Sequence, residues 1–206
     1  MDNFCTFYIV RHGENEGNVA RIMQGHSEPN LTKNGEAQAK LIGQKLSSIT
    51  FDAVFSSDLI RAKRTAEIIA LDRKLAVITS QALRERTFGH MEGKTYEEYH
   101  QKFEKLIEEK AKLAFRISRK LKLAPDIESD DEVISRFITF LRETAVAYAR
   151  KTILIVSHGG PMRLLLLHLG WADDTLLKPG FMPNTGFIKL RSDGVDFFID
   201  GVVTSI

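Results

Sequence analysis

Short apolar runs alternate along the chain with longer segments in which apolar residues recur every three or four positions. The short runs are rich in β-branched and aromatic residues, as buried strands are. They occupy residues 4–10, 53–57, 75–78, 152–157, 187–190 and 195–199. This pattern predicts a sheet of about six strands, with helices between most of them.

The periodic segments carry helix start signals. Thr32 is placed to cap a helix whose buried face includes Leu41, and Asp58 is placed to cap the helix after the second strand. Residues 129–132 form a capping box that opens a long helix. Residues 95–122 predict another helix, and a proline lies just beyond their end.

Strands that alternate with helices are typical of α/β proteins, in which helices cover the faces of a central sheet. We therefore expect an α/β fold arranged as a three-layer sandwich. A length of 206 residues suits a single domain that spans residues 1–206. No internal repeat or low-complexity tract divides the sequence.

Composition narrows the class of protein. A net charge of +2 is too small to indicate nucleic-acid binding, and no apolar run is long enough to cross a bilayer. The single cysteine, Cys5, cannot form an internal disulfide, which fits a reducing compartment. The first residues show no signal-peptide pattern. We expect a cytoplasmic protein that binds neither nucleic acid nor membranes.

Charged or imidazole side chains follow four of the predicted strands. Arg11 and His12 end the first, Arg61 follows the second, Glu85 follows the third, and His158 ends the strand at 152–157. Because the carboxyl ends of parallel strands share one edge of a sheet, we expect these five side chains to converge.

That combination suits transfer of a phosphoryl group. A neutral imidazole such as His12 can attack phosphorus, and guanidinium groups neutralise the charge of the phosphate oxygens. A carboxyl such as Glu85 can protonate the departing alkoxide and then serve as a base toward water. The side chains supply the cations, so no metal is required.

The motifs that carry these residues resemble those of the histidine phosphatase superfamily, which includes the cofactor-dependent phosphoglycerate mutases. The resemblance covers almost the whole chain, with the motifs in the order of that family. The matching blocks are Arg11-His12-Gly13-Glu14 with Asn18, Ser56-Ser57-Asp58-Leu59 with Arg61 and Thr65-Ala66, Leu83-Arg84-Glu85 with Phe88-Gly89 and Glu92-Gly93, and Ser157-His158-Gly159-Gly160.

The resemblance implies a role for each catalytic candidate. It makes His12 the phosphorylated nucleophile and Glu85 the proton donor. The remainder of the phosphate pocket would be formed by Arg11, Arg61 and His158.

The resemblance also implies binding positions and a fold. Asn18, Gln24 and Gly25 would contact substrate, and the backbone of Gly159 would contact phosphate. The family has a mostly parallel sheet of six strands between helices, with a helical insertion over the site. Residues 95–128, called the lid below, correspond to that insertion.

The lid is rich in Lys and Arg between residues 102 and 122, with apolar residues interleaved. We expect an amphipathic helix with a solvated cationic face. Attraction of a substrate with several negative charges is the functional alternative, and a helix lying on a membrane surface is a third.

Several charged residues near the motifs have simpler interpretations. Of Arg84 and Arg86, we expect one to pair with a carboxylate and the other to meet solvent. Glu14 is suited to bracing its loop. The pairs Asp130-Asp131 and Asp173-Asp174 are expected as helix caps or surface carboxylates, and no metal ligands are predicted.

The segment after Glu85 separates the two activities found in this family. Mutases usually continue with Tyr-Gly-x-Leu-x-Gly-Leu-Asn-Lys, whereas this chain carries Glu92-Gly93, a form that resembles the phosphatase branch. Pro183-Asn184-Thr185-Gly186 resembles the same branch, whereas Asn15 stands where Ser or Thr is common.

We therefore expect a cofactor-independent phosphatase of small phosphorylated metabolites. A 2,3-bisphosphoglycerate-dependent phosphoglycerate mutase is the first alternative, and a catalytically weak phospho-ligand or protein-binding module is the second. Whether the protein is a homodimer stays open.

Overall fold

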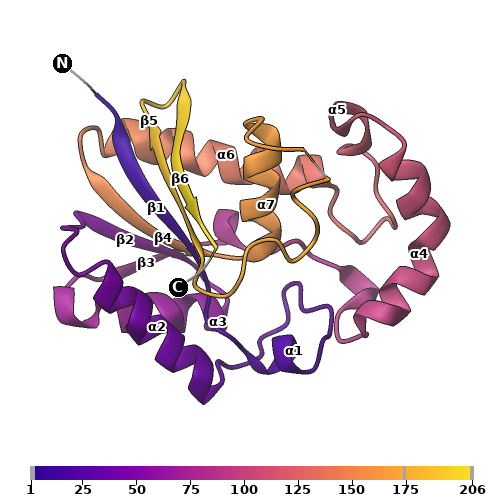
Figure 1. Ribbon diagram of the computed structural model, residues 1–206, viewed down its shortest axis with the longest axis horizontal. Helices are drawn as coiled ribbons and strands as arrows, with labels where there is room; N and C mark the ends of the chain where they lie inside the picture. Colours follow the sequence, from indigo (N-terminus) through magenta and orange to yellow (C-terminus); the bar gives the residue numbers. More distant parts are fainter. Residues whose placement is uncertain (1–2, 174, 205–206) are drawn as a thin grey trace.

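The computed structural model describes residues 3–173 and 175–204, and these residues form an α/β fold around one mixed sheet (Figure 1). Its strands are β1 (Cys5–Arg11), β2 (Ala53–Ser57), β3 (Val77–Ser80), β4 (Thr152–Ser157), β5 (Phe187–Ser192) and β6 (Phe197–Val203). Its α-helices are α1 (Glu16–Val19), α2 (Lys33–Lys45), α3 (Ile60–Ala70), α4 (Tyr96–Ala111), α5 (Phe115–Ser118), α6 (Asp130–Ala147) and α7 (Gly159–His168). Short 3-10 helices span Leu71–Arg73, Gln81–Leu83 and Gly89–Met91.

The described strands have the order β3-β2-β4-β1-β5-β6. The pairs β2–β3, β2–β4 and β1–β4 are parallel, whereas β5 runs antiparallel to both β1 and β6. The central strands β1, β2 and β4 consequently end at the same edge. This arrangement confirms the predicted sandwich and brings the charged strand ends together.

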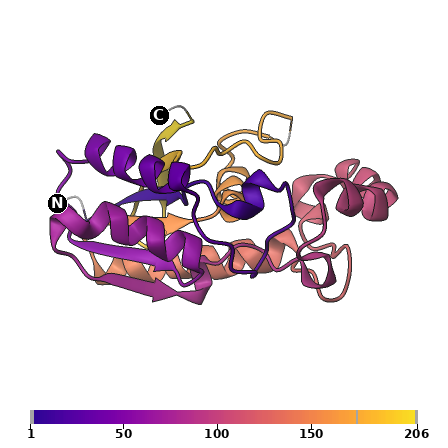
Figure 2. The ribbon, with the colours of Figure 1, turned by 90° about the horizontal axis from the view of Figure 1, so that it is seen from below.

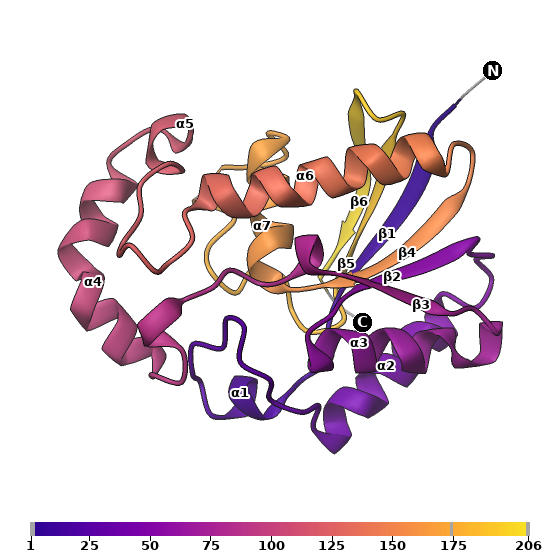
Figure 3. The ribbon, with the colours of Figure 1, turned by 180° about the vertical axis from the view of Figure 1, so that it is seen from behind.

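Alternate residues along the strands face two separate apolar layers. Phe7 and Ile155 belong to the layer under α6 and α7, whereas Tyr8 and Leu154 belong to the layer under α2 and α3. Seen from behind, α6 and α7 lie across one face of the sheet (Figure 3), and α2 lies on the opposite face (Figure 2). The two layers hold the strand ends in fixed positions between them.

Two of the predicted helix caps are present in the structure. Thr32 caps α2 through the backbone N–H of Gly35, and Ser129 forms the expected capping box with Glu132. Leu41, predicted to be buried, is exposed, because α2 packs its Ala39 and Ile42 side against the sheet.

The prediction that Asp58 caps α3 was wrong. The helix begins after Leu59 without a side-chain cap, and the Asp58 carboxylate instead accepts two hydrogen bonds from Arg84, each 2.7 Å long. The bidentate ion pair turns both carboxylate oxygens of Asp58 toward the Arg84 guanidinium and so draws the side chain away from the helix start. The backbone N–H of Ile60 donates to Glu28 instead.

The lid is helical but is not the single helix predicted over residues 95–122. Three ion pairs join Lys110, Arg119 and Lys122 to the first turn of α6, at Asp130, Asp131 and Glu132. A straight helix would separate Lys110 and Lys122 by about 18 Å, too far for partners in one turn. Helix α4 ends at Ala111, and a separate short helix, α5, follows. Both helices stand apart from the sheet on the side where β1 and β4 end (Figures 1 and 3).

An apolar cluster fastens the lid to the body. Met23 and Met91, from the loops beside the site, pack with Tyr99 and Phe103 of α4 and with Ile127. In the described part of the chain, no helix has the length and apolar character that a membrane span requires.

Candidate active site

His12 lies at the end of β1, where the buried strand passes into the loop before α1. Its Nδ1 is 2.8 Å from the carbonyl oxygen of Gly13. A carbonyl can only accept, so Nδ1 carries the proton and the lone pair of the neutral ring is on Nε2. Burial lowers the pKa of His12 well below its usual value, and the nearby Arg61 and Arg11 lower this pKa further. His12 is therefore neutral and available as a nucleophile.

His158 ends β4 and lies beside His12. The two ring centroids are 5.1 Å apart in an edge-on arrangement, and His158 is fully buried. Its pKa is also lowered well below the usual value, first by burial and then by Arg61. Among the described residues, neither ring nitrogen of His158 has a hydrogen-bond partner. A buried donor without a partner is rare and fits a position reserved for ligand oxygen atoms.

Arg61 comes from the first turn of α3, is buried, and lies close enough to both histidines to lower their pKa values. It donates from Nη1 to the Ser27 carbonyl (2.7 Å) and from Nη2 to the Gly25 carbonyl (2.8 Å). Within the described residues, its Nε is buried without a partner. Burial lowers the pKa of Arg61 to about 10, so the group stays positive at neutral pH.

Arg11 precedes His12 and lies against the start of α7. Its Nη1 donates to the Met182 carbonyl at 2.5 Å. A Cβ added to Gly159 would lie 3.3 Å from the Arg11 Nε, so the glycine lets the helix approach the guanidinium closely. This places the predicted phosphate contact at Gly159 next to Arg11.

Glu85 reaches the same place from the segment after β3. Its carboxylate accepts from the backbone N–H of Arg86 at 2.8 Å and from that of Gly160 at 3.1 Å. Any side chain at Gly160 would collide with this carboxylate. The five predicted residues His12, His158, Arg11, Arg61 and Glu85 thus meet at one end of the sheet, and we call them the strand-end cluster.

The residues predicted to bind substrate lie in α1 and the loop that follows it, and one of them, Gly25, holds a residue of the cluster. Gly25 has a positive φ of 50° and offers its carbonyl to Arg61. Gln24 is buried, and its side-chain oxygen accepts from Asn15 at 2.6 Å. Asn18 is more accessible and accepts from Asn184 at 3.2 Å. Asn15 caps α1 and braces Gln24.

Several residues support the cluster without having been predicted as site residues. Thr65 accepts from the backbone N–H of Gly13 (3.0 Å) and donates to the Arg61 carbonyl (2.8 Å). Asn184 donates to the His12 carbonyl at 2.9 Å. Both lie in segments that the motif comparison included, so their positions were visible in the sequence although their contacts were not.

Glu92 links the loop that carries Gln24 and His26 to the segment that carries Glu85. One of its carboxylate oxygens accepts from the backbone N–H of His26, from the Thr87 hydroxyl and from the backbone N–H of Phe88, each at 3.0 Å. The Glu92-Gly93 motif is therefore part of the framework around the site.

The expectation that only one of Arg84 and Arg86 pairs with a carboxylate was wrong. Arg84 pairs with Asp58, and Arg86 pairs with the buried Asp130. Glu14 braces its loop as expected, because it accepts from the Thr32 hydroxyl at 2.6 Å.

The loop after β1 and the start of α2 pass each other with no side chain between them. A Cβ at Gly13 would overlap the main chain of Gly35, and a Cβ at Gly35 would overlap the main chain of Glu14.

Asp173 accepts from Thr175 and the backbone N–H of Leu176, whereas Asp174 lies outside the described residues. No group of three or more His, Cys, Asp or Glu side chains in residues 3–173 and 175–204 is arranged to hold a metal ion.

Comparison with known proteins tests the resemblance. The model of the histidine phosphatase superfamily (branch 1) matches residues 7–204. The chain belongs to the histidine phosphatase superfamily.

Relatives within this superfamily carry both phosphatase and mutase names. The chain is 31% identical over 168 residues to the uncharacterized phosphatase PhoE of Bacillus subtilis, covering 82% of this chain and 79% of that protein. It is 33% identical over 167 residues to a 2,3-bisphosphoglycerate-dependent phosphoglycerate mutase of Cytophaga hutchinsonii, covering 78% and 75%. The solved structure of Bacillus stearothermophilus YhfR has a TM-score of 0.83 and 28% identity, covering 98% of each chain.

Proposed function

We propose that the protein is a metal-independent phosphatase of small phosphomonoesters that works through a phosphohistidine on His12. One observation carries the proposal: the His12 tautomer leaves a lone pair on Nε2, among buried donors that have no partner in the described part of the chain. A phosphate group is the ligand whose charge and oxygen atoms satisfy this arrangement.

In the first step, Nε2 of His12 attacks phosphorus and the bond from phosphorus to the ester oxygen breaks. The leaving alkoxide takes a proton from the protonated carboxyl of Glu85 and departs as an alcohol. Arg11, Arg61 and His158 bind the equatorial oxygens and stabilise their charge in the transition state.

In the second step, water attacks the phosphorus of phosphohistidine. Its proton goes to the Glu85 carboxylate, the P–N bond breaks, and His12 regains its lone pair as phosphate leaves. Glu85 therefore returns to its protonated form and is ready for another turnover.

The segment after Glu85 favours phosphatase over mutase. The Glu92-Gly93 form resembles the phosphatase branch, and the relative from Bacillus subtilis carries a phosphatase name. The mutase stays the second candidate, since the Cytophaga hutchinsonii relative bears that name over a similar share of the chain.

The test is to trap the intermediate. Rapid quenching with a 32P-labelled monoester is expected to leave acid-labile, base-stable label on the wild type and none on His12→Ala. His100→Ala is the matched control, because His100 is an exposed histidine on α4. Turnover of p-nitrophenyl phosphate that survives in His12→Ala would refute the proposal.

A second assay separates the two activities. With 3-phosphoglycerate and catalytic 2,3-bisphosphoglycerate, we expect free phosphate to form faster than 2-phosphoglycerate. The opposite ratio would identify a mutase while leaving the phosphohistidine in place.

A further inference from the structure

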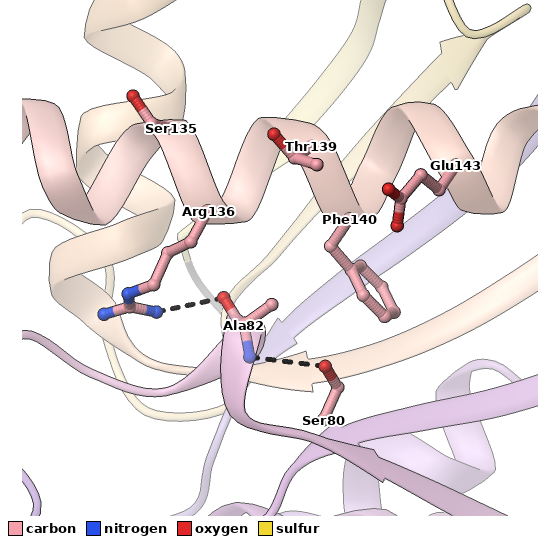
Figure 4. Close-up of a pocket in the computed structure, with 7 residues that line it drawn as sticks. All are labelled: Ser80, Ala82, Ser135, Arg136, Thr139, Phe140 and Glu143. Atoms are coloured by element: carbon pink, nitrogen blue, oxygen red, sulfur yellow. Dashed lines mark hydrogen bonds between the residues drawn. The ribbon is translucent and has the colours of Figure 1, made fainter.

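Arg136, on α6, holds the main chain that carries Glu85. Its Nη1 donates to the carbonyls of Ala82 (2.9 Å) and Arg84 (2.7 Å), and its Nη2 donates to the carbonyl of Glu85 itself (3.0 Å). Figure 4 shows the Arg136 guanidinium pointing from α6 to the Ala82 carbonyl, at the rim of a pocket. One side chain thus fixes three carbonyls of a four-residue segment.

The remaining guanidinium donors are held by Glu128. Arg136 donates to its two carboxylate oxygens from Nε and Nη2, both at 3.1 Å. Burial raises the pKa of Glu128, but Arg136, together with the backbone N–H of Thr87 and with His26, keeps the pKa below its usual value. The ionised Glu128 also accepts from the backbone N–H of Thr87 at 2.9 Å. The pair therefore makes hydrogen bonds to the main chain on both sides of Glu85, at Arg84 and at Thr87.

Two further contacts hold Glu85 itself. The Glu85 carbonyl also accepts from Nε2 of His26 at 3.0 Å, and the Glu85 carboxylate is held by Gly160 of α7. The carboxylate is consequently placed by two elements, α7 at its oxygens and α6 at its backbone. Only the second depends on Arg136.

We infer that Arg136, paired with Glu128, is a positioning residue that sets the distance between the Glu85 carboxyl and the leaving oxygen. The inference rests on the proposed function, because it needs Glu85 as the proton donor. Proton transfer requires hydrogen-bond contact, and a displacement of about 1 Å can cost about 100-fold in rate. Lysine cannot replace the planar fork, since an ammonium group cannot serve three carbonyls and a carboxylate together.

The test compares substrates with good and poor leaving groups. We expect Arg136→Gln to lower kcat/KM for an alkyl phosphate by about 30-fold, and for p-nitrophenyl phosphate by about threefold or less. A good leaving group needs little protonation, so a misplaced acid affects it little. Compared with Arg136→Gln, Arg136→Lys is expected to recover less than half of the decrease in log kcat/KM for the alkyl phosphate. Arg142→Gln, an exposed arginine of the same helix, is the control.

A double variant separates positioning from general damage. In a Glu85→Gln background, adding Arg136→Gln is expected to change the ratio of the two kcat/KM values by less than about twofold. Equal losses for both substrates in Arg136→Gln would overturn the inference. If Arg136→Gln does not fold, Glu128→Gln replaces it and must shift the ratio in the same direction.

The failure of the proposed function would look different. If Glu85→Gln lowers kcat/KM equally for both substrates, Glu85 is not the proton donor, whatever the result for Arg136. If Glu85→Gln discriminates between the substrates and Arg136→Gln does not, only the inference on Arg136 fails.

Discussion

The strand-end cluster and the lid use their cations in opposite ways. In the cluster, Arg11 and Arg61 each keep a buried Nε atom without a partner in the described part of the chain. In the lid, Lys110, Arg119 and Lys122 are each paired with a carboxylate of α6. The cluster has donors to offer a ligand, whereas these lid cations are already engaged.

This contrast revises the interpretation of the basic lid. These three side chains do not form the fully solvated cationic face that was expected, because the acidic first turn of α6 neutralises their charges. The same pairs reduce the charge that the lid could present to an anionic substrate. The lid cations named here attach the lid to α6, so the proposal leaves the binding of phosphate to the cluster.

The largest expected effect comes from removing the most buried of the three ion pairs between the lid and α6. Asp130 is buried and pairs with both Arg86 and Lys110. We expect Asp130→Ala to lower the free energy of unfolding by about 3 kcal/mol, because two cations lose their partner in a poorly solvated place. Urea unfolding followed by circular dichroism measures this loss.

The neighbouring ion pair supplies the control for that measurement. Asp131 pairs with Arg119 at 3.0 Å, but both side chains are more exposed. Asp131→Ala should cost less than about 1 kcal/mol. Equal losses in the two variants would show that burial does not distinguish the two pairs.

A smaller effect is expected from disturbing the cluster through Gly160. In Gly160→Ala the new methyl group must displace the Glu85 carboxylate, which lies at the end of a side chain and can move. We expect kcat/KM for an alkyl phosphate to fall about 30-fold, equivalent to about 2 kcal/mol. Gly201→Ala, whose Cβ would meet open space, is the matched control. Unchanged activity in Gly160→Ala would argue against the placement of the acid.

The smallest expected effect is the dependence of stability on pH. Burial and Arg61 hold His12 and His158 neutral in the folded protein, whereas the unfolded chain binds their protons near pH 6.5. The unfolded state therefore gains protons as the pH falls, and the folded state loses stability below about pH 6.5. Between pH 7.5 and pH 6.0 the pair should account for a loss of about 1.5 kcal/mol.

Comparison with a double variant isolates these two histidines from other titrating groups. The stability of His12→Asn/His158→Asn should fall less than that of the wild type over the same pH range. Parallel curves for the two proteins would show that both imidazoles titrate normally in the fold.

Much of the fold could be predicted because its signals are local. The strands at residues 53–57 and 152–157 have the predicted bounds, since a short β-rich run between polar turns has few alternatives. The third strand lies two residues later than predicted, at Val77–Ser80. It is the edge strand, where exposed positions such as Ile78 and Thr79 give a weaker pattern.

The convergence of the cluster was also predictable, because parallel strands bring their carboxyl ends to one edge. The failures concern contacts between distant segments. Asp58 was expected at a helix start but pairs with Arg84, and no local pattern links Arg136 to Glu85. Partners separated by tens of residues are chosen by packing, which periodicity and capping rules do not describe.

The bare-backbone contact between Gly13 and Gly35 has a consequence for how this protein can evolve. An alanine at one position cannot be compensated by any change at the other, because the other residue has no side chain left to shorten. A substitution at either glycine is therefore tolerated only if the loop after β1 and the start of α2 change shape together. A tolerance map of the chain would show two intolerant points, 22 positions apart, that neither hydrophobicity nor charge explains.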